Sequence, residues 1–304
     1  MHIVTLLGEQ PIPSLLMLRY LKPDSFTIVS TEFTAPRASR LMKLVPGISE
    51  ERKETIQVPP YELQKAEELI RGHLEKLLGK VDKLAFDLTG GTKIMALAGY
   101  AVAQAFRAPV FYLRTQRESI LFRYDFDETG VVKSEEAMPL AEKANQLINL
   151  EDYLRAYLGD FQVTGPCRNE PGRSFELAVK SALSLALDEV MLGIKVGGAL
   201  DIDLAVRLGN KVGVAELKTG GKAESKRPLE QLNAVCGREF LGTYTKKFIV
   251  IDRVWRDKHP NLNDLAQAWG VKVIELPSFS RGKSLSKEDQ TKLIQMVKAT
   301  LEGK

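Results

Sequence analysis

Short apolar runs alternate with segments of helical spacing through the first 115 residues, and this alternation constrains the fold more than any other feature. The runs are rich in β-branched and aromatic residues, which is typical of strands, and they occupy residues 2–7, 25–30, 83–88 and 109–115. The intervening segments repeat apolar residues every three or four positions, which predicts helices at 13–21, 35–45, 61–79 and 92–106. This order favours an α/β fold with a mainly parallel sheet and helices on both faces.

The alternation predicts a Rossmann-like domain over residues 1–140. A further strand is expected at 118–127, at an edge of the sheet, and the acidic stretch 127–139 is interpreted as an irregular boundary region. A connecting helical linker is expected at 141–165, with one helix or a helix pair within 142–160.

Residues 166–304 are expected to form a second α/β domain with a different order of elements. A helix at 175–187 precedes two strands within 197–220, which are joined by a Gly-Asn turn. Further elements are expected as helices at 229–242 and 284–303, the latter capped by Ser286, and as strands at 246–252 and 271–276.

Composition narrows the class of protein. The chain has 304 residues, which is enough for two domains, and no segment approaches eighteen uninterrupted apolar residues. The N-terminus lacks the pattern of a signal peptide, so we expect a cytoplasmic protein without membrane association. Cys167 and Cys236 fit neither a disulfide framework nor a zinc site. Residues 1–150 carry 19 basic and 19 acidic side chains, whereas residues 151–304 carry 24 and 20, a weak indication of a polyanionic partner for the second half.

The segment DLTGGTK, residues 87–93, closes a buried strand and opens a helix. Gly90 and Gly91 let the backbone approach a ligand, and the N-terminus of the following helix attracts anions. Thr89, Thr92 and Lys93 would add hydroxyl donors and a cation. The spacing matches neither a dinucleotide fingerprint nor a P-loop, so a tight turn without a ligand stays an equal alternative.

A second group of polar residues lies in the two strands of 197–220. Asp201 and Asp203 share one face of the first strand, and Glu216 and Lys218 share one face of the second. If the hairpin closes around Asn210, Asp203 and Glu216 converge, and two neighbouring carboxylates favour a bound cation. Oxygen ligands favour Mg²⁺ or Mn²⁺, which would activate water for phosphodiester hydrolysis.

Two further features extend this hypothesis. Lys218 would orient the water or stabilise negative charge on the phosphate, and Glu176 is a candidate additional ligand or acid–base group. The basic segment after the second strand carries Lys222, Lys226 and Arg227, which could contact nucleic-acid phosphates. The alternative is a solvated hairpin with a Glu216–Lys218 surface ion pair and ordinary loop charges.

The order of Glu176, Asp203, Glu216-Leu217-Lys218 and Gln231 resembles the PD-(D/E)xK nuclease superfamily. The first half, through DLTGGTK and the loop GEQPIPS after the first strand, resembles a CARF domain. A CARF sensor fused to a PD-(D/E)xK nuclease is the layout of ancillary nucleases of type III CRISPR antiviral defence. Ile202 stands where that superfamily often has proline, although the position varies.

The resemblance implies a homodimer that binds a cyclic oligoadenylate, most often cyclic tetra-adenylate, and that then cuts nucleic acid with a divalent metal. Glu176, Asp203, Glu216 and Lys218 would be catalytic, with Asp203 and Glu216 as the metal ligands. The activator site would be lined by Gly8, Gln10, Thr89, Gly90, Gly91, Thr92, Lys93, Arg114 and Thr115.

Two other functions stay open from the sequence. A non-catalytic CARF sensor would bind the activator and regulate a partner. A constitutive restriction or repair nuclease would use the same carboxylates but would leave DLTGGTK unexplained. The sequence does not decide between DNA and RNA, between nicking and full cleavage, or between ring sizes of the activator.

Overall fold

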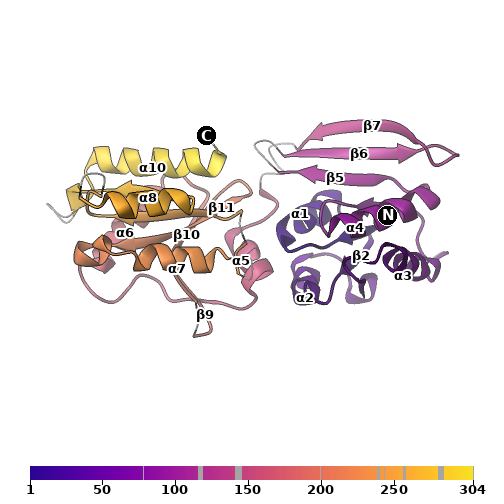
Figure 1. The fold of residues 1–304 in the computed structure, drawn as a ribbon, viewed down its shortest axis with the longest axis horizontal. Helices are drawn as coiled ribbons and strands as arrows, with labels where there is room; N and C mark the ends of the chain where they lie inside the picture. Colours follow the sequence, from indigo (N-terminus) through magenta and orange to yellow (C-terminus); the bar gives the residue numbers. More distant parts are fainter. Residues whose placement is uncertain are drawn as a thin grey trace. The chain divides into compact units, whose positions relative to one another are not determined.

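The structure is a computed structural model that describes residues 1–77, 79–115, 119–140, 146–198, 200–237, 240–242, 244–255, 258–279 and 284–303. The chain forms two compact units, Met1–Ile148 and Asn149–Lys304, which are each built around one sheet (Figure 1). No helix in the described ranges is long and apolar enough to cross a lipid bilayer.

The first unit contains a seven-stranded sheet in the order β3-β2-β1-β4-β5-β6-β7. Its strands are β1 (His2–Leu6), β2 (Ser25–Ser30), β3 (Lys53–Gln57), β4 (Leu84–Asp87), β5 (Val110–Arg114), β6 (Ile120–Phe126) and β7 (Val132–Pro139). The first five strands of this order from β3 to β5 are parallel, and β6 and β7 are antiparallel. The prediction of an α/β fold with a parallel-rich sheet is therefore confirmed.

Helices cover both faces of this sheet. The helices are α1 (Pro11–Leu21), α2 (Ala35–Leu44), α3 (Leu63–Glu75) and α4 (Lys93–Ala105), with a 3-10 turn, η1, at Glu50–Arg52. α3 and α4 lie side by side and bury Ile70, Met95 and Val102 against Val4 and Phe86 of the strands. α1 and α2 pack together on the strands β1 to β3, outside that apolar cluster, and so cover the opposite face.

Two expectations for the first unit are wrong. The run at 118–127 contains β6, which is not the edge strand, because β7 pairs with its outer side. The pairing runs from Ile120 opposite Pro139 to Phe126 opposite Val132. The stretch 127–139, interpreted as a boundary region, contains this strand. β7 is exposed along nearly its whole length and carries Glu135 and Glu136, as protected edge strands do, so it lacks the apolar alternation that marks a strand.

The second unit contains a six-stranded sheet in the order β13-β12-β11-β10-β9-β8. Its strands are β8 (Gln162–Val163), β9 (Glu189–Val196), β10 (Leu200–Leu208), β11 (Lys211–Lys218), β12 (Lys246–Ile251) and β13 (Val271–Glu275). β8 to β11 are antiparallel neighbours, and β11 to β13 are parallel. The change of direction takes place beside β11, which carries Glu216 and Lys218.

Five α-helices of the described part pack around this sheet: α5 (Leu150–Leu158), α6 (Gly172–Leu183), α7 (Arg227–Val235), α8 (Pro260–Ala268) and α10 (Lys287–Glu302). α6 and α10 bury Phe175, Val179 and Leu293 against Leu204 and Leu217 on one face. α7 packs on β11 and β12 with apolar residues outside that cluster, on the other face. A short 3-10 helix, η3 (Gly220–Glu224), follows β11.

Several predicted elements of the second unit differ from the structure. The helix expected at 175–187 begins three residues earlier and ends at Leu183. The helix expected at 229–242 ends at Val235 as α7. Within the expected linker 141–165, α5 and β8 belong to the second unit, whereas residues 141–145 lie outside the described residues. The expected Ser286 cap is present, because its hydroxyl accepts from the Asp289 N–H at 3.1 Å.

Candidate functional site

The hairpin of β10 and β11 brings three of the predicted site residues together. Leu208 pairs with Lys211 across Gly209 and Asn210, and Leu204 pairs with Ala215, so Asp203 and Glu216 follow as the next opposed pair. Lys218 Nζ lies 2.5 Å from Asp203 Oδ2 and 2.6 Å from Glu216 Oε2. The Leu217 N–H also donates to Asp203 Oδ2, at 2.8 Å.

Asp201 does not join this group. Its carboxylate is 54% exposed and forms an ion pair with Lys195 of β9 at 3.2 Å. Asp201 lies two residues before Asp203 on the same strand, so both side chains point to one face of the sheet. Lys218 nevertheless forms its ion pair with Asp203 and not with Asp201. The two aspartates therefore have different ion-pair partners, and only Asp203 belongs to the group around Lys218.

Glu176 approaches the same centre from α6 and is buried. Its Oε2 accepts from the Cys167 N–H at 2.8 Å. Burial raises the pKa of Glu176 above its usual range, and the charge of Asp203 adds to this while Lys218 opposes it. The electrostatic influence of Asp203 and Lys218 indicates that Glu176 shares their surroundings.

Cys167 is a neighbour of this centre that sequence reasoning did not assign. Burial and contact with Glu176 raise the pKa of its thiol to about 11, so the thiol stays neutral near pH 7. Its backbone N–H orients Glu176, a contact between a loop and a helix that no spacing in the sequence indicates. Cys236 is buried, and burial raises the pKa of its thiol to about 12.

Glu216 has an unusual environment for a carboxylate. It is only 2% exposed, and burial, with Asp203 next, raises its pKa well above the usual range. Its Oε2 is buried and lies 2.6 Å from the Lys218 ammonium. Burial works to lower the pKa of Lys218, but the two carboxylates outweigh it and hold the ammonium protonated.

These residues fit a divalent cation in their chemistry. Asp203 and Glu216 present carboxylate oxygens from opposed strands, and a carboxylate that pairs with one ammonium keeps lone pairs for a cation. Among the described residues, however, no group of three or more His, Cys, Asp or Glu is arranged to hold a metal. The protein ligands would thus be the two carboxylates, with Glu176 near them but not in a common cage.

The predicted nucleic-acid residues follow β11 directly. Lys222 is exposed in η3, and Lys226 and Arg227 are exposed at the start of α7, where Lys226 pairs with Glu230 at 3.3 Å. Gly220 N–H donates to buried Asp252 at 3.0 Å, and the Trp255 indole donates to the Ala223 carbonyl at 2.6 Å. Asp252 and Trp255, which sequence reasoning missed, thus fasten this basic segment to the sheet.

The predicted ligand loops of the first unit are in backbone contact. An added Cβ at Gly90 would lie 2.1 Å from the Leu6 carbonyl, and one at Gly8 would lie 3.0 Å from the Gly91 nitrogen. Gly91 has φ +79°, a conformation that favours glycine. The packing of the two turns therefore leaves no room for a side chain at Gly90 and little room for one at Gly8.

The two threonines of DLTGGTK use their hydroxyls within the protein. Thr89 donates to Asp87 at 2.5 Å and accepts from the Leu113 N–H at 2.9 Å. Thr92 donates to the Pro60 carbonyl at 2.6 Å and caps α4 by accepting from the Met95 N–H. Burial raises the pKa of Asp87, which also accepts from Thr5 at 2.6 Å. Both hydroxyls therefore shape the turn, in addition to any contact with a ligand.

The remaining ligand-site candidates lie at the same end of the parallel strands. Lys93 is exposed in the first turn of α4, and Gln10 is the N-cap residue of α1. Arg114 is exposed at the end of β5, with its guanidinium 6.0 Å from the Phe122 ring, and Thr115 follows it. This end of an open parallel sheet is where α/β proteins bind ligands.

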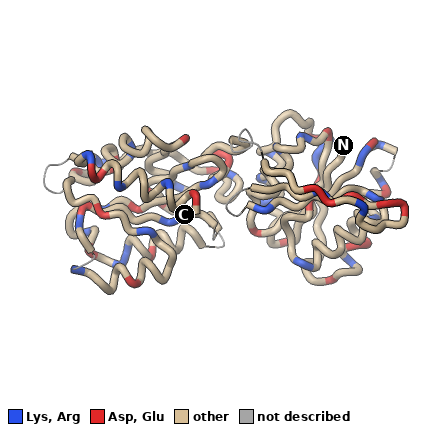
Figure 2. The backbone as a smooth tube through the Cα atoms, turned by 90° about the horizontal axis from the view of Figure 1, so that it is seen from above, with Lys and Arg blue, Asp and Glu red and all other residues tan. Residues whose placement is uncertain are grey.

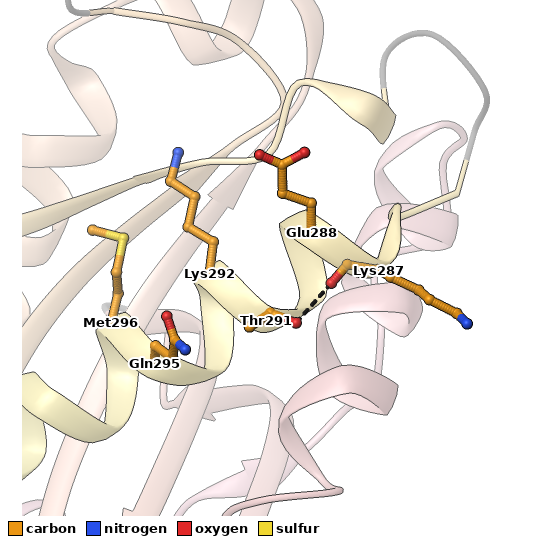
Figure 3. A pocket seen from close by; sticks show the side chains of 6 residues that line it. All are labelled: Lys287, Glu288, Thr291, Lys292, Gln295 and Met296. Atoms are coloured by element: carbon orange, nitrogen blue, oxygen red, sulfur yellow. Dashed lines mark hydrogen bonds between the residues drawn. The ribbon is translucent and has the colours of Figure 1, made fainter.

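Neither the distribution of charged residues nor the hollow on α10 indicates another functional site. Basic and acidic residues are interspersed along both units (Figure 2). An open hollow of about 400 Å³ lies on α10, lined by Lys287, Glu288, Thr291, Lys292, Gln295 and Met296 (Figure 3). All six residues come from one helix, and none belongs to the carboxylate centre or to the glycine turns. The hollow is therefore a surface feature of α10.

The family model for the Card1 CARF domain matches residues 2–153, which is half of the chain. The chain belongs to this CARF family. The matched residues include all seven strands of the first unit and the glycine turns after β1 and β4. No curated protein matches the chain in sequence.

Solved structures share the fold of both units with this CARF protein. Protein VC1899 from Vibrio cholerae has a TM-score of 0.73 at 15% identity, over 98% of each chain. Can2 from Sulfobacillus thermosulfidooxidans, solved with cyclic tetra-adenylate, has a TM-score of 0.68 at 15% identity, over 97% of each chain. A type III CRISPR defence DNA nuclease activated by cyclic oligoadenylate has a TM-score of 0.60 at 16% identity, over 83% of this chain and 45% of that one.

Proposed function

We propose that this CARF protein is a divalent-metal-dependent nuclease that a cyclic oligoadenylate switches on, in type III CRISPR antiviral defence. The observation that carries the proposal is the group formed by Asp203, Glu216 and Lys218, in which one ammonium contacts two carboxylates and one of these carboxylates is almost fully buried. Removing such charges from water costs free energy, and buried charged clusters of this kind are enriched at functional sites.

The residues of the centre have distinct roles in this proposal. Asp203 and Glu216 would hold Mg²⁺ or Mn²⁺, which would supply an activated water and a polarised phosphoryl oxygen when bound. Lys218, kept protonated by its neighbours, orients the attacking water or stabilises the negative charge that develops on the phosphate. Glu176, whose pKa is raised by burial, is suited to exchange a proton or to complete the metal site.

The rest of the proposal concerns the ligands. Lys222, Lys226 and Arg227 contact the nucleic acid, which is DNA or RNA, beside the cutting centre. Gly8, Gln10 and the turn 89–93 bind the phosphates of cyclic tetra-adenylate, with Arg114 and Thr115 at the border. Two copies of the chain form the activator site as a homodimer. Support comes from membership of the CARF family and from the fold shared with Can2 and the DNA nuclease.

Cleavage by site variants tests the proposal. The wild-type protein with Mn²⁺ is expected to cut plasmid or single-stranded nucleic acid when cyclic tetra-adenylate is present. Glu216→Ala and Lys218→Ala are expected to abolish cutting while they leave the binding of the activator unchanged. Asp201→Ala is the matched control, because Asp201 pairs with Lys195 outside the centre, and it should retain cutting. Variants of Glu216 and Lys218 that cut normally would overturn the proposal.

A second candidate is a CARF sensor that binds the activator and performs no chemistry. The observation that favours it is that no group of three or more metal-ligating side chains is present among the described residues. This candidate predicts binding of cyclic tetra-adenylate without cleavage of DNA or RNA by any divalent metal. The same cleavage assay separates the two.

A further inference from the structure

Tyr61 is a highly exposed aromatic residue beside the glycine turn of the first unit. Its side chain is 79% exposed, and it lies in the segment that joins β3 to α3. Among the described residues it has no ring partner and no hydrogen bond. Both faces of its ring are thus open to a ligand.

The segment that carries Tyr61 is anchored to the N-terminus of α4. Thr92 Oγ1 donates to the carbonyl of Pro60, the residue directly before Tyr61, at 2.6 Å. The same hydroxyl caps α4 by accepting from the Met95 N–H at 3.1 Å. Pro59 and Pro60 restrict the backbone before the ring. Tyr61 therefore lies in a stiff segment. The residue before it, Pro60, is hydrogen-bonded to Thr92, the N-cap of α4.

This arrangement combines a flat apolar surface with a cationic helix start. Lys93 and the first turn of α4 suit a phosphate, whereas an exposed phenol ring suits the face of a nucleobase. Phe33, the exposed aromatic after β2, is less suited, because Arg37 already lies 5.7 Å from its ring centroid. A ligand with a phosphate and a base in each repeat matches both groups at once.

We infer that Tyr61 stacks against an adenine of the cyclic oligoadenylate while the turn 89–93 holds the adjoining phosphate. The inference rests on the proposed function and names the residue that recognises the base rather than the charge. Stacking on an aromatic ring contributes roughly 5- to 150-fold in Kd for each base. The contribution depends on the ring and not on the phenol hydroxyl.

Calorimetric titration of the full chain with cyclic tetra-adenylate tests the inference. Tyr61→Ala removes one ring from each copy of the proposed homodimer and is expected to weaken binding by roughly 25-fold or more, whereas Tyr61→Phe and Tyr61→Trp are expected to bind like the wild type. The loss for Tyr61→Ala should be the same at low and high salt, whereas the loss for Lys93→Ala should shrink as salt screens its charge. Tyr244→Ala, at a 69% exposed tyrosine of the second unit, is the control and should bind normally.

Each outcome of this titration decides something. Normal binding by Tyr61→Ala, or weak binding by both Tyr61→Ala and Tyr61→Phe, would overturn the stacking role. A wild-type protein that binds no cyclic tetra-adenylate would overturn the proposed activator, and the inference with it. Thermal unfolding of Tyr61→Ala at the wild-type temperature shows that a loss of affinity is not a loss of fold.

Discussion

At the scale of single residues, Lys218 supplies the positive charge for two carboxylates that the fold brings together. Its ammonium contacts both Asp203 and Glu216, and its side chain is only 19% exposed. Removing one partner of a buried ion pair lowers the free energy of unfolding by more than the intact pair adds to it, because the remaining charges stay buried without a partner. The centre is therefore sensitive to substitution of this lysine even without a bound metal.

We expect Lys218→Met to lower the free energy of unfolding by about 3 kcal/mol in the presence of a chelator. Lys195→Met, which breaks the exposed ion pair with Asp201, is the matched control and should cost about 0.5 kcal/mol. Urea denaturation of both variants at neutral pH measures the difference. Equal effects of the two substitutions would show that the Lys218 group is an ordinary surface pair.

His2 makes the stability of the first unit depend on pH. Its ring nitrogens contact Ser25 at 2.8 Å and Thr27 at 3.0 Å, and Thr27 also contacts His73 at 3.0 Å. Burial, followed by the charges of His73 and the N-terminus, lowers the pKa of His2 from 6.5 to about 4. His73 itself faces Glu54 at 3.4 Å, which partly offsets the burial that lowers its pKa.

The unfolded chain therefore binds more protons than the folded one between pH 6.5 and about 4. Stability from the neutral His2 is complete above pH 6.5 and is lost as the pH falls toward 4. We expect His2→Gln to flatten this part of the profile, where the wild type loses up to about 1.4 kcal/mol per pH unit. Urea unfolding at several pH values measures both slopes. Parallel profiles for the two proteins would contradict this role of His2.

At the scale of elements, the turn between β4 and α4 depends on a glycine without room for a side chain. We expect Gly90→Ala to destabilise the first unit by more than about 1 kcal/mol and to weaken activator binding, because its Cβ would overlap the Leu6 carbonyl. Gly72→Ala in α3 is the control, since no atom lies within 4 Å of the added Cβ. It should stabilise the protein by about 0.5 kcal/mol. Thermal unfolding and calorimetric titration of the two variants measure these effects, and a neutral Gly90→Ala would contradict the packing argument.

The sequence predicted the elements whose apolar pattern is strong. β1, β2 and β4 are largely buried apolar runs and β5 is partly buried, and all four alternate with helices of clear periodicity, so their order predicted a parallel-rich sheet. β3, with the sequence KETIQ, and the edge strand β7 were missed, because both are largely polar and hold their place through backbone pairing. β9 was missed because it continues a helical pattern from α6 with few turn signals.

The candidate site was predictable in part for the same reason. The period of two in β10 and β11 and the Gly-Asn turn indicated that Asp203 and Glu216 would meet. The contact of Cys167 with Glu176 joins a loop to a helix nine residues away, and those of Asp252 with Gly220 and of Trp255 with Ala223 each span 32 residues. No local pattern encodes such contacts, because they arise only when the sheet and its loops pack together.

At the scale of the whole molecule, we propose that each chain of a homodimer couples activator binding in its CARF unit to cutting by its second unit. To move such a dimer from mostly inactive to mostly active, the ligand must favour the active arrangement by about 5 kcal/mol. In the proposed homodimer, two copies of the α4 N-terminus and of Lys93 would hold the four phosphates of cyclic tetra-adenylate and would provide charged contacts of the required kind. Coupling of this size would make cutting depend steeply on the activator.

The most direct test of the central claim is a cleavage titration of labelled DNA and RNA with a panel of cyclic oligoadenylates, each with Mn²⁺ and with a chelator. We expect cutting of at least one nucleic acid only when Mn²⁺ and one ring size, expected to be the tetra-adenylate, are both present. Cutting that is equally fast without any cyclic oligoadenylate, or that persists in the chelator, would contradict it.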